Sequence, residues 1–382
     1  MNGIDPITIE VIRNYLLSAA REMNRNLIRT AYSTIIYEVK DFGVGIYDNQ
    51  CRLLAEAPGL AIFTRGNDYA LKQIVQYLGH ENIHPEDIIL LNYHYMSAAH
   101  TLDVTAAAPI FHNDKLVGFS AVKQHWKDLG QKDPGYCTDT TDVYQEGLLI
   151  PCLKIHKRGV LNQDLVELIR FNSRMPENTL GDMNAKISSC ITGRKRVEEL
   201  IDKFGQETYS LAVENILDHG ERIARVQLAD LPKGTWSAED WVDDDGIDRD
   251  TLVKIKVTVT ISDTEMIVDF TGSDPQTKGP INVPIGMTMG TAALVFKAVT
   301  TPDTAANDGN FRPLKVIAPP GCVMHAIEPA PTFTMWPALL AVDIILKALS
   351  KAGVDLVPAC SGGDIFSTVS YTHLTLPTSD LV

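Results

Sequence analysis

The chain has 382 residues, and 45% hydrophobic with 21% charged residues is the balance of a globular protein. The formal net charge is −14, and the sequence has no run of basic residues, which excludes a protein that binds the phosphate backbone of nucleic acids. The sequence has no apolar stretch long enough to span a bilayer, and its start does not resemble a signal peptide. We therefore expect a cytoplasmic protein of two or three structural units that binds neither nucleic acid nor membrane.

The six cysteines are scattered along the chain, and no two form a C-x-x-C pair. In a chain of this size they are expected to be reduced and mostly buried, as in cytosolic proteins. Cys137 and Cys152 are the candidates for a nucleophilic thiol, but no neighbouring residue marks either of them as activated.

The first predicted element is a helix that begins at Pro6. Asp5 is a favourable N-cap, and proline is favoured at the first helical position. Apolar side chains then recur at helical spacing as far as Ala31, which predicts an amphipathic helix. The next predicted elements are a hairpin over 39–54, a helix over 68–78 and a strand over 87–93.

A second hairpin is predicted over 105–122, where two apolar runs flank a short polar turn. Asn113 and Asp114 can supply a tight two-residue turn. If His112 pairs with Lys115 across this turn, every pair further along the two strands is determined.

This register places two histidines within reach of each other. Leu102 lies opposite His125, and His100 is the diagonal neighbour of His125 on the same face. Asp103 points to the other face of a regular strand. It joins the histidines only if the segment 98–103 is a loop or is bulged.

Two imidazoles and one carboxylate form a donor set that suits a divalent ion such as zinc, manganese or iron. The same combination within a short window also arises by chance, so the spacing alone leaves both interpretations open. The remaining histidines that we considered are interpreted as surface or hydrogen-bonded side chains, namely His94, His112, His156, His219 and His325.

The second half of the chain begins with helices and continues with strands. The segment 177–228 is predicted to be helical, with a break at Gly205 and an end at Pro232. An acidic loop is expected over 236–250. The remaining predicted elements are a hairpin formed by 252–261 and 265–270, and helices over 287–300 and 337–352.

These elements predict an α+β fold with mixed β-hairpins or sheet, long helices and two or more subdomains. The composition changes near Pro232, so we divide the chain into a metal-site α+β domain over 1–232 and a hairpin-plus-helix region over 233–369. The residues 370–382 resemble translated sequencing-adapter DNA. We interpret them as a non-native tail and the preceding region as incomplete at its C-terminal end.

Several blocks of sequence, in order, resemble the hydantoinase B/5-oxoprolinase family. The spacing of His100 and Asp103 is similar to the family's His-Leu-Pro-Asp motif, and the likeness runs from about residue 5 to about residue 369. The other matching blocks are 5–13, 30–33, 40–42, 143–148, 174–177, 181–182, 269–273 and 279–282.

The resemblance implies one subunit of an ATP-dependent enzyme that opens cyclic amides such as hydantoins, 5-oxoproline or lactams. A hydantoinase A-type partner would bind ATP, which agrees with the lack of any phosphate-binding motif in this sequence. The alternative within the family is the alpha-type subunit of an ATP-dependent ketone carboxylase that acts on acetone or acetophenone. A third interpretation is a truncated fragment that is inactive by itself.

The resemblance also implies roles for individual residues. It assigns His100, Asp103 and His125 as metal ligands and adds Asp41 as a further one. We assign Asp128 and Glu146 as catalytic candidates, acting either as general base or as support for the ligands. A purely structural hydrogen-bonding role for these two carboxylates is the alternative.

The sequence departs from the family pattern beside both histidines. Trp126 follows His125 where many members have a second histidine, and tryptophan cannot bind a metal ion. Ala98 and Ala99 replace the small Gly-Gly or Gly-Thr pair before His100. These departures keep the ketone carboxylase alternative open.

Overall fold

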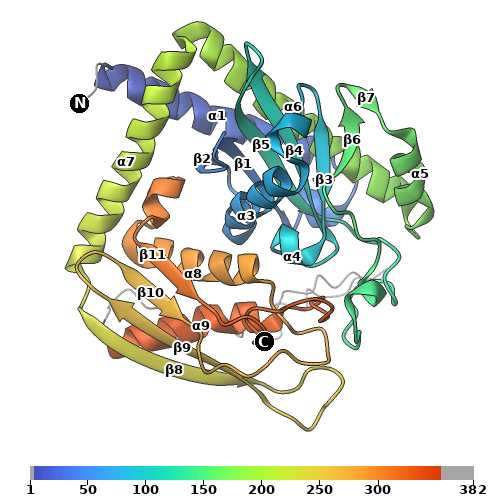
Figure 1. The fold of residues 1–382 in the computed structure, drawn as a ribbon, viewed down its shortest axis with the longest axis vertical. Helices are drawn as coiled ribbons and strands as arrows, with labels where there is room; N and C mark the ends of the chain where they lie inside the picture. The colour runs from blue at the N-terminus through green and yellow to red at the C-terminus, as the bar shows by residue number, and fades with distance from the viewer. Residues whose placement is uncertain (1–3, 354–382) are drawn as a thin grey trace, which may run out of the picture.

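The computed structural model describes residues 4–353. Residues 370–382, which we interpret as a non-native tail, lie outside this range. Two β-sheets, each packed against helices, make up this part of the chain (Figure 1). The first helix begins where it was predicted, because the carboxylate of Asp5 accepts a hydrogen bond from the backbone N–H of Thr8 at the start of α1 (Pro6–Thr30). Among the described helices, none is both long and apolar enough to cross a membrane.

The first sheet has seven antiparallel strands in the order β2-β1-β5-β4-β3-β6-β7. The residues of its central strands are nearly all buried, so the sheet is covered on both faces. Its strands are β1 (Phe42–Asp48), β2 (Leu53–Glu56), β3 (Ile88–Leu91), β4 (Asp103–His112), β5 (Lys115–His125), β6 (Leu153–Lys157) and β7 (Val160–Leu161).

Helices cover the two faces of this sheet. On one face, α1 and α6 (Pro176–Phe204) pack against each other, and α6 contacts β4 and β5. On the other face, α3 (Ala61–Leu78) contacts β1 and β5. The shorter helices are α2 (Thr34–Tyr37), α4 (His94–Ser97) and α5 (Gln163–Phe171), with 3₁₀ turns η1 (His80–Asn82) and η2 (Val143–Glu146).

The long helical segment is broken where it was predicted. Gly205 has φ of +83° and ends α6. The chain then continues into α7 (Gln206–Asp230), which runs along one side of the molecule towards the second sheet (Figure 1).

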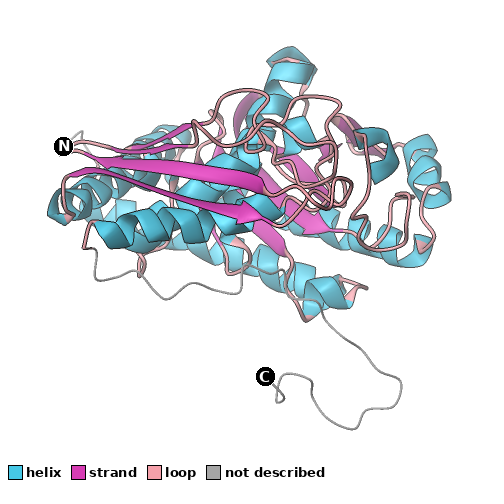
Figure 2. Cartoon of the chain, turned by 90° about the horizontal axis from the view of Figure 1, so that it is seen from below, coloured by secondary structure: helices cyan, strands magenta, loops and turns pink. Residues whose placement is uncertain are grey.

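The second sheet has four strands in the order β11-β10-β9-β8, and only β10 and β11 are parallel. Figure 2 shows its long strands lying against helices, and α9 (Trp336–Lys351) contacts β8 and β9. The strands are β8 (Gly234–Val242), β9 (Val253–Ile261), β10 (Met266–Asp269) and β11 (Leu314–Ile317). A 3₁₀ turn, η3 (Asp308–Phe311), precedes β11.

The prediction of an acidic loop over 236–250 was wrong for its first half, which forms β8. This strand pairs with β9 along its whole length, and the hydroxyls of Ser237 and Thr258 lie 2.9 Å apart across the pair. Ala238 of this strand is buried and Glu239 is exposed, because successive side chains of a strand point to opposite faces. β8 is also an edge strand. Charged residues are common on edge strands, so their presence does not indicate a loop.

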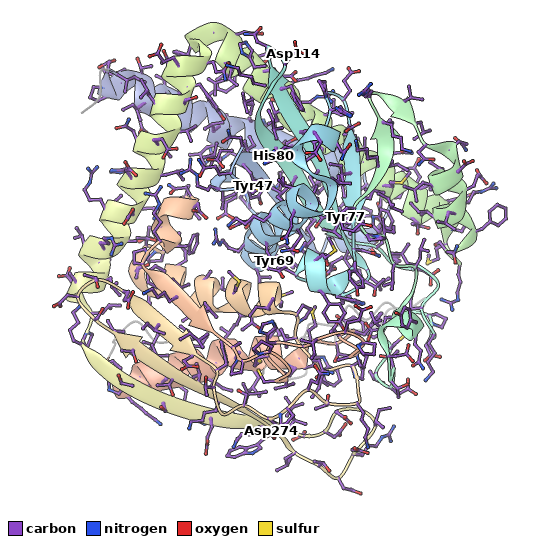
Figure 3. All side chains as sticks on the ribbon, in the orientation of Figure 1. Tyr47, Tyr69, Tyr77, His80, Asp114 and Asp274 are labelled. Carbon is purple, nitrogen blue, oxygen red and sulfur yellow. The ribbon has the colours of Figure 1, made fainter. Side chains whose placement is uncertain are left out.

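The two sheets share one continuous hydrophobic core through α3 and α8 (Ile285–Thr300). The space between the ribbons is filled with side chains, including Tyr69 of α3, whose hydroxyl donates to the carbonyl oxygen of Tyr95 at 3.2 Å (Figure 3). The division of the chain at Pro232 therefore stays a prediction, and its second region extends past the described residues.

Candidate metal centre

The hairpin that carries the candidate ligands turns where it was predicted. His112 pairs with Lys115, as the turn chemistry requires. Between Ile110 and Phe111 the pairing then shifts by one residue, and Val117 of β5 is left without a partner on β4. The shift is a β-bulge. Beyond it, each residue of β4 pairs with the β5 residue next to the one predicted, and this residue points to the opposite face.

The bulge places Asp103 opposite His125, so the predicted pairing of Leu102 with His125 was wrong. Directly paired residues share a face of the sheet, so the carboxylate points to the same side as the imidazole. The bulge in β5 brings Asp103 to His125. Residues 98–102 form the predicted loop, and its turn brings Asp103 to His100, whose carbonyl oxygen accepts a hydrogen bond from the backbone N–H of Asp103 at 3.0 Å.

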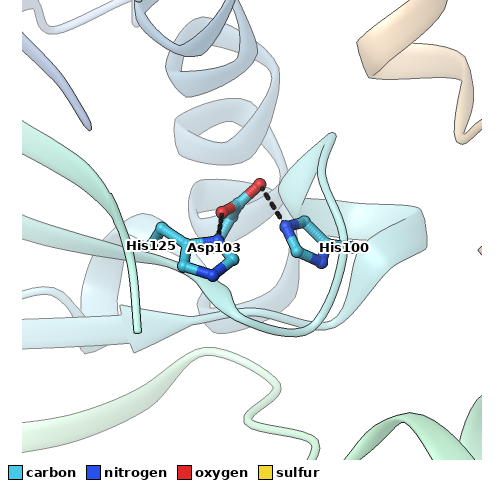
Figure 4. A group of neighbouring side chains, drawn as sticks. All are labelled: His100, Asp103 and His125. Atoms are coloured by element: carbon cyan, nitrogen blue, oxygen red, sulfur yellow. Dashed lines mark hydrogen bonds and ion pairs between the residues drawn. The ribbon is translucent and has the colours of Figure 1, made fainter. Parts of the chain in front are cut away.

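The three side chains converge on the Asp103 carboxylate (Figure 4). Its Oδ1 lies 3.0 Å from Nδ1 of His125, and its Oδ2 lies 3.1 Å from Nε2 of His100. The two imidazole rings are 5.1 Å apart between centroids. All three residues are buried, with exposed fractions of 4% for His100, 1% for Asp103 and 7% for His125.

This donor set fits a divalent ion. One candidate ligand atom from each residue lies within 4.8 Å of the others. Ligand atoms of a tetrahedral ion at about 2.1 Å lie about 3.4 Å from one another, close to both distances from Asp103 to the histidines. Two nitrogens and one carboxylate oxygen are donors that zinc, manganese and iron accept.

The carboxylate and the imidazoles stabilise one another's charge. Burial by itself would raise the pKa of Asp103, but His100 and His125 hold it well below its usual range. Burial would lower the pKa of His125, but the hydrogen bond to Asp103 and the charge of Asp41 raise it. The Asp103 carboxylate is therefore anionic at neutral pH.

Asp41 lies near His125, but it is not part of the closely spaced group formed by His100, Asp103 and His125. Its Oδ2 is 3.9 Å from Nδ1 of His125, and its side chain is 26% exposed. Its carbonyl oxygen accepts a hydrogen bond from the backbone N–H of His125 at 3.2 Å. Burial raises the pKa of the Asp41 carboxyl, while the charge of His125 opposes this. Its role as a fourth ligand stays a prediction.

The turn that carries His100 is tightly packed. Ala98 ends α4 in the left-handed conformation, with φ of +61°. Its methyl group lies where a side chain on Gly286 of α8 would be, since a Cβ on Gly286 would stand 2.3 Å from that of Ala98. Lys123 of β5 donates to the carbonyl oxygen of Ser97. Contacts from α8 and β5 thus determine where His100 sits.

Two aromatic rings pack beside His100. Phe333 is fully buried and contacts the imidazole edge to face, with centroids 5.2 Å apart. Tyr136 is 44% exposed and lies 6.1 Å from the same imidazole and 5.6 Å from Phe333. Neither aromatic residue was among the predicted site residues.

A sequence model of the family described as Hydantoinase B/oxoprolinase matches residues 5–374. The chain belongs to this family. An uncharacterized family relative from Methanocaldococcus jannaschii is 34% identical over 371 residues, which are 96% of this chain and 65% of the relative. Caprolactamase subunit beta of Pseudomonas jessenii is 28% identical over 367 residues, which are 95% of this chain and 62% of that subunit.

Solved structures show the same fold as this family member. The crystal structure of the ATP-dependent caprolactamase from Pseudomonas jessenii matches 92% of this chain and 61% of its own, with a TM-score of 0.85 and 28% identity. Acetone carboxylase in its nucleotide-free structure matches 91% of this chain and 48% of its own, with a TM-score of 0.83. At 20% identity, the second likeness concerns the fold alone.

The two catalytic candidates of this hydantoinase B family member have other partners. Asp128 accepts hydrogen bonds from both the backbone N–H and the guanidinium of Arg174. Glu146 is hydrogen-bonded by Thr140, Thr332 and Phe333. Within residues 4–353, no hydrogen bond or ion pair joins either carboxylate to the two histidines or Asp103. Their catalytic roles stay predictions.

Trp126, at the position where the resemblance led us to expect a second histidine in many members, belongs to the hydrophobic core. It is fully buried, and the ammonium group of Lys186 lies 4.2 Å from the centre of its ring. Successive residues of an extended chain point to opposite faces, so a side chain at 126 points away from the one at 125.

We expect Trp126→His to destabilise the protein without adding a metal ligand. Loss of the large ring should lower the free energy of unfolding by about 3 kcal/mol, measured by urea denaturation. Metal content should not change. Trp126→Phe is the matched control, because it keeps an aromatic ring below Lys186. A gain in metal affinity for Trp126→His would contradict this assignment.

Residues that the sequence did not single out come from distant segments. In the sequence, Phe333 lies between β11 and α9. Tyr136 lies in a loop in which Gly130 and Gly135 have positive φ. His94 was interpreted as a surface or hydrogen-bonded residue, and it is fully buried beside Glu146. The only local signal that His94 lies near this site was its position shortly before His100 in the sequence.

Proposed function

We propose that this chain is the B-type subunit of an ATP-dependent cyclic-amide hydrolase. The carrying observation is the buried group of His100, Asp103 and His125 in a chain of the hydantoinase B/oxoprolinase family. The chain spans less than two thirds of the two relatives' lengths, so substrate and partner belong to the proposal. The proposed substrate is a hydantoin, 5-oxoproline or a lactam. The similarity to a caprolactamase supports a lactam among these three.

In this proposal, His100, Asp103 and His125 hold a divalent ion, and Asp41 is the fourth protein ligand. Such an ion would polarise a substrate carbonyl or lower the pKa of a bound water. Asp103 orients both imidazoles, because each of its oxygens contacts a different ring. Burial of these residues excludes bulk water, which strengthens every electrostatic contact in the site.

The other carboxylates and the aromatic rings support this site. Asp128 anchors Arg174 at the start of α6 by two hydrogen bonds, so we assign it to holding the segment after β5 rather than to proton transfer. Tyr136 is 44% exposed and its ring lies 6.1 Å from that of His100, so a substrate that approaches the imidazole from this side would contact it.

ATP would be bound by a hydantoinase A-type partner. The sequence has no phosphate-binding loop, so this chain contributes no nucleotide site that a motif reveals. The partner activates the amide oxygen with ATP, and this chain supplies the second half of the reaction. Alone, the chain is expected to be inactive.

The experiment is reconstitution with an A-type partner. We expect ATP-dependent ring opening of at least one compound in a panel of hydantoin, 5-oxoproline and caprolactam. The ring-opened product is measured by chromatography. No turnover on the panel, together with bicarbonate-dependent ATP consumption with acetone or acetophenone, would replace the proposal by its alternative.

That alternative is the alpha-type subunit of a ketone carboxylase. The observation in its favour is Trp126, which removes the histidine that many hydantoinase-type members have next to His125. If neither reaction occurs with a partner that binds this chain, the chain is a non-catalytic fragment.

A further inference from the structure

Glu146 is a fully buried carboxyl at the end of η2. Its Oε1 accepts hydrogen bonds from the Thr140 hydroxyl at 3.0 Å and from the backbone N–H groups of Thr332 at 2.8 Å and Phe333 at 3.0 Å. Its Oε2 has no hydrogen-bond partner among the described residues and lies 3.6 Å from Nδ1 of His94. One oxygen is thus saturated, and the other faces a single imidazole.

The surroundings favour the neutral acid form of this carboxyl. Burial raises the pKa of Glu146 to about 8, although the hydrogen bonds to Oε1 oppose the shift. Burial lowers the pKa of His94 to about 3, so the imidazole carries no charge that could balance a carboxylate. Oε2 faces Nδ1 of His94 at 3.6 Å, which is longer than a hydrogen bond, and the Thr101 hydroxyl lies 3.4 Å from the same nitrogen. A proton on Oε2 removes the charge that this unpaired oxygen would otherwise carry in a buried site.

The hydrogen bonds of Glu146 connect distant parts of the chain at the metal centre. Glu146 lies in the segment between β5 and β6 of the first sheet, whereas Thr332 and Phe333 precede α9. The Phe333 ring is fully buried and contacts the imidazole of His100 edge to face. Whatever holds the backbone of Phe333 therefore also determines the surface against which His100 rests.

We propose that Glu146 is a positioning residue that acts as a neutral acid, holding the Phe333 backbone so that its ring fixes the orientation of His100. This inference rests on the proposed function only for the identity of His100 as a metal ligand. It separates Glu146 from general-base catalysis, because a base must present a free lone pair to the substrate. The contacts of Glu146 are with His94, Thr140 and the Phe333 segment instead.

The test compares a neutral isostere with a truncation. In Glu146→Gln, the amide oxygen can accept the same three hydrogen bonds, and an uncharged NH₂ group takes the place of Oε2 beside His94. We expect Co²⁺ affinity, measured by chelator competition, to stay within about threefold of wild type. Glu146→Ala and Phe333→Ala should each lower Co²⁺ affinity by about tenfold or more, the usual effect of removing support from a metal ligand.

The visible spectrum of bound Co²⁺ gives a second readout. It should match wild type in Glu146→Gln and change in Phe333→Ala, because the imidazole is free to rotate. Phe333→Leu keeps apolar bulk and is the conservative control. Unchanged Co²⁺ affinity and spectrum in Phe333→Ala would overturn the proposal, as would loss of turnover in Glu146→Gln with Co²⁺ affinity retained.

The pH dependence of stability tests the acid form without any activity. Since burial raises the pKa of folded Glu146 to about 8, its contribution is complete below the pKa of an unfolded carboxyl and is lost as pH rises towards 8. The titratable groups that face it are His94, Tyr95, Cys137 and Asp142.

We expect the thermal midpoint of wild type to decrease, relative to that of Glu146→Gln, as the pH rises from 5 to 8. Glu146→Gln is the reference because its side chain does not titrate. Parallel pH profiles for the two proteins would overturn the acid form. If wild type binds no Co²⁺, the metal centre fails, and this profile still decides the state of Glu146.

Discussion

Replacing His125 with alanine should abolish stoichiometric binding of a divalent ion. His125 and His100 each contact a different oxygen of Asp103 in a buried site. Removal of one imidazole deletes a nitrogen donor from the group of three buried ligands and leaves one oxygen of Asp103 without its partner. We expect at least about a 100-fold loss of affinity, more than the loss caused by disturbing a residue that only supports a ligand. Elemental analysis of the purified, chelator-washed protein is the measurement.

His100→Ala should have the same effect, and His219→Ala is the matched control. His219 lies on α7, and its Nδ1 is 2.7 Å from the guanidinium of Arg222, with no contact to the metal centre. Unchanged metal content in both His100→Ala and His125→Ala would refute the centre. Circular dichroism of each variant separates loss of metal from loss of fold.

Asp41→Asn distinguishes three protein ligands from four. At 3.9 Å from Nδ1 of His125, Asp41 has to move to reach a shared ion. If it is a ligand, Asp41→Asn should weaken binding less than His125→Ala does, because Asp41 is 26% exposed and lies outside the closely spaced group of buried ligands. Equal metal affinity in wild type and Asp41→Asn would restrict the centre to the three buried residues.

The sequence predicted the two histidines of this centre for reasons that the structure bears out only in part. The turn at Asn113 specifies the pairing nearest to it, and that pairing is as expected. The bulge at Val117 has no turn chemistry of its own. The one local signal was Gly118, where β1 approaches so closely that a Cβ would stand 2.3 Å from the carbonyl oxygen of Tyr47.

The aromatic surroundings of the centre could not be read from periodicity. Phe333 reaches His100 from a distant segment, and Glu146 accepts hydrogen bonds from the backbone of that segment. Local patterns report which face of an element is buried, and they carry no information on which distant loop covers that face. The family resemblance supplied Asp41, which no spacing argument would have joined to His125.

Gly286→Ala should destabilise the protein and weaken the metal centre together. A methyl group at 286 would stand 2.3 Å from the Cβ of Ala98 and 2.8 Å from the ring of Tyr69, so the packing of α8 against the turn must open. Overpacking of this kind costs about 1–3 kcal/mol, partly offset by about 1 kcal/mol of improved helix propensity. Urea denaturation and chelator competition are the measurements.

Gly290→Ala is the matched control on the same helix. Its Cβ would lie 3.1 Å from the side chain and 3.2 Å from the backbone oxygen of Ile62. These contacts are tight but wider than those at 286, and helix propensity improves equally, so Gly290→Ala should cost less stability than Gly286→Ala. Equal stability losses at 286 and 290 would mean that α8 tolerates no side chain at either position, independently of the His100 turn.

The double variant Ala98→Gly with Gly286→Ala decides whether the effect passes through the turn. Removing the Ala98 methyl group vacates the space that the new methyl group at position 286 needs, and glycine also removes the cost of about 1–2 kcal/mol of a left-handed alanine. The double variant should therefore recover stability and metal affinity beyond the sum of the single effects. Recovery of stability without recovery of metal affinity would show that α8 supports the fold but does not position His100.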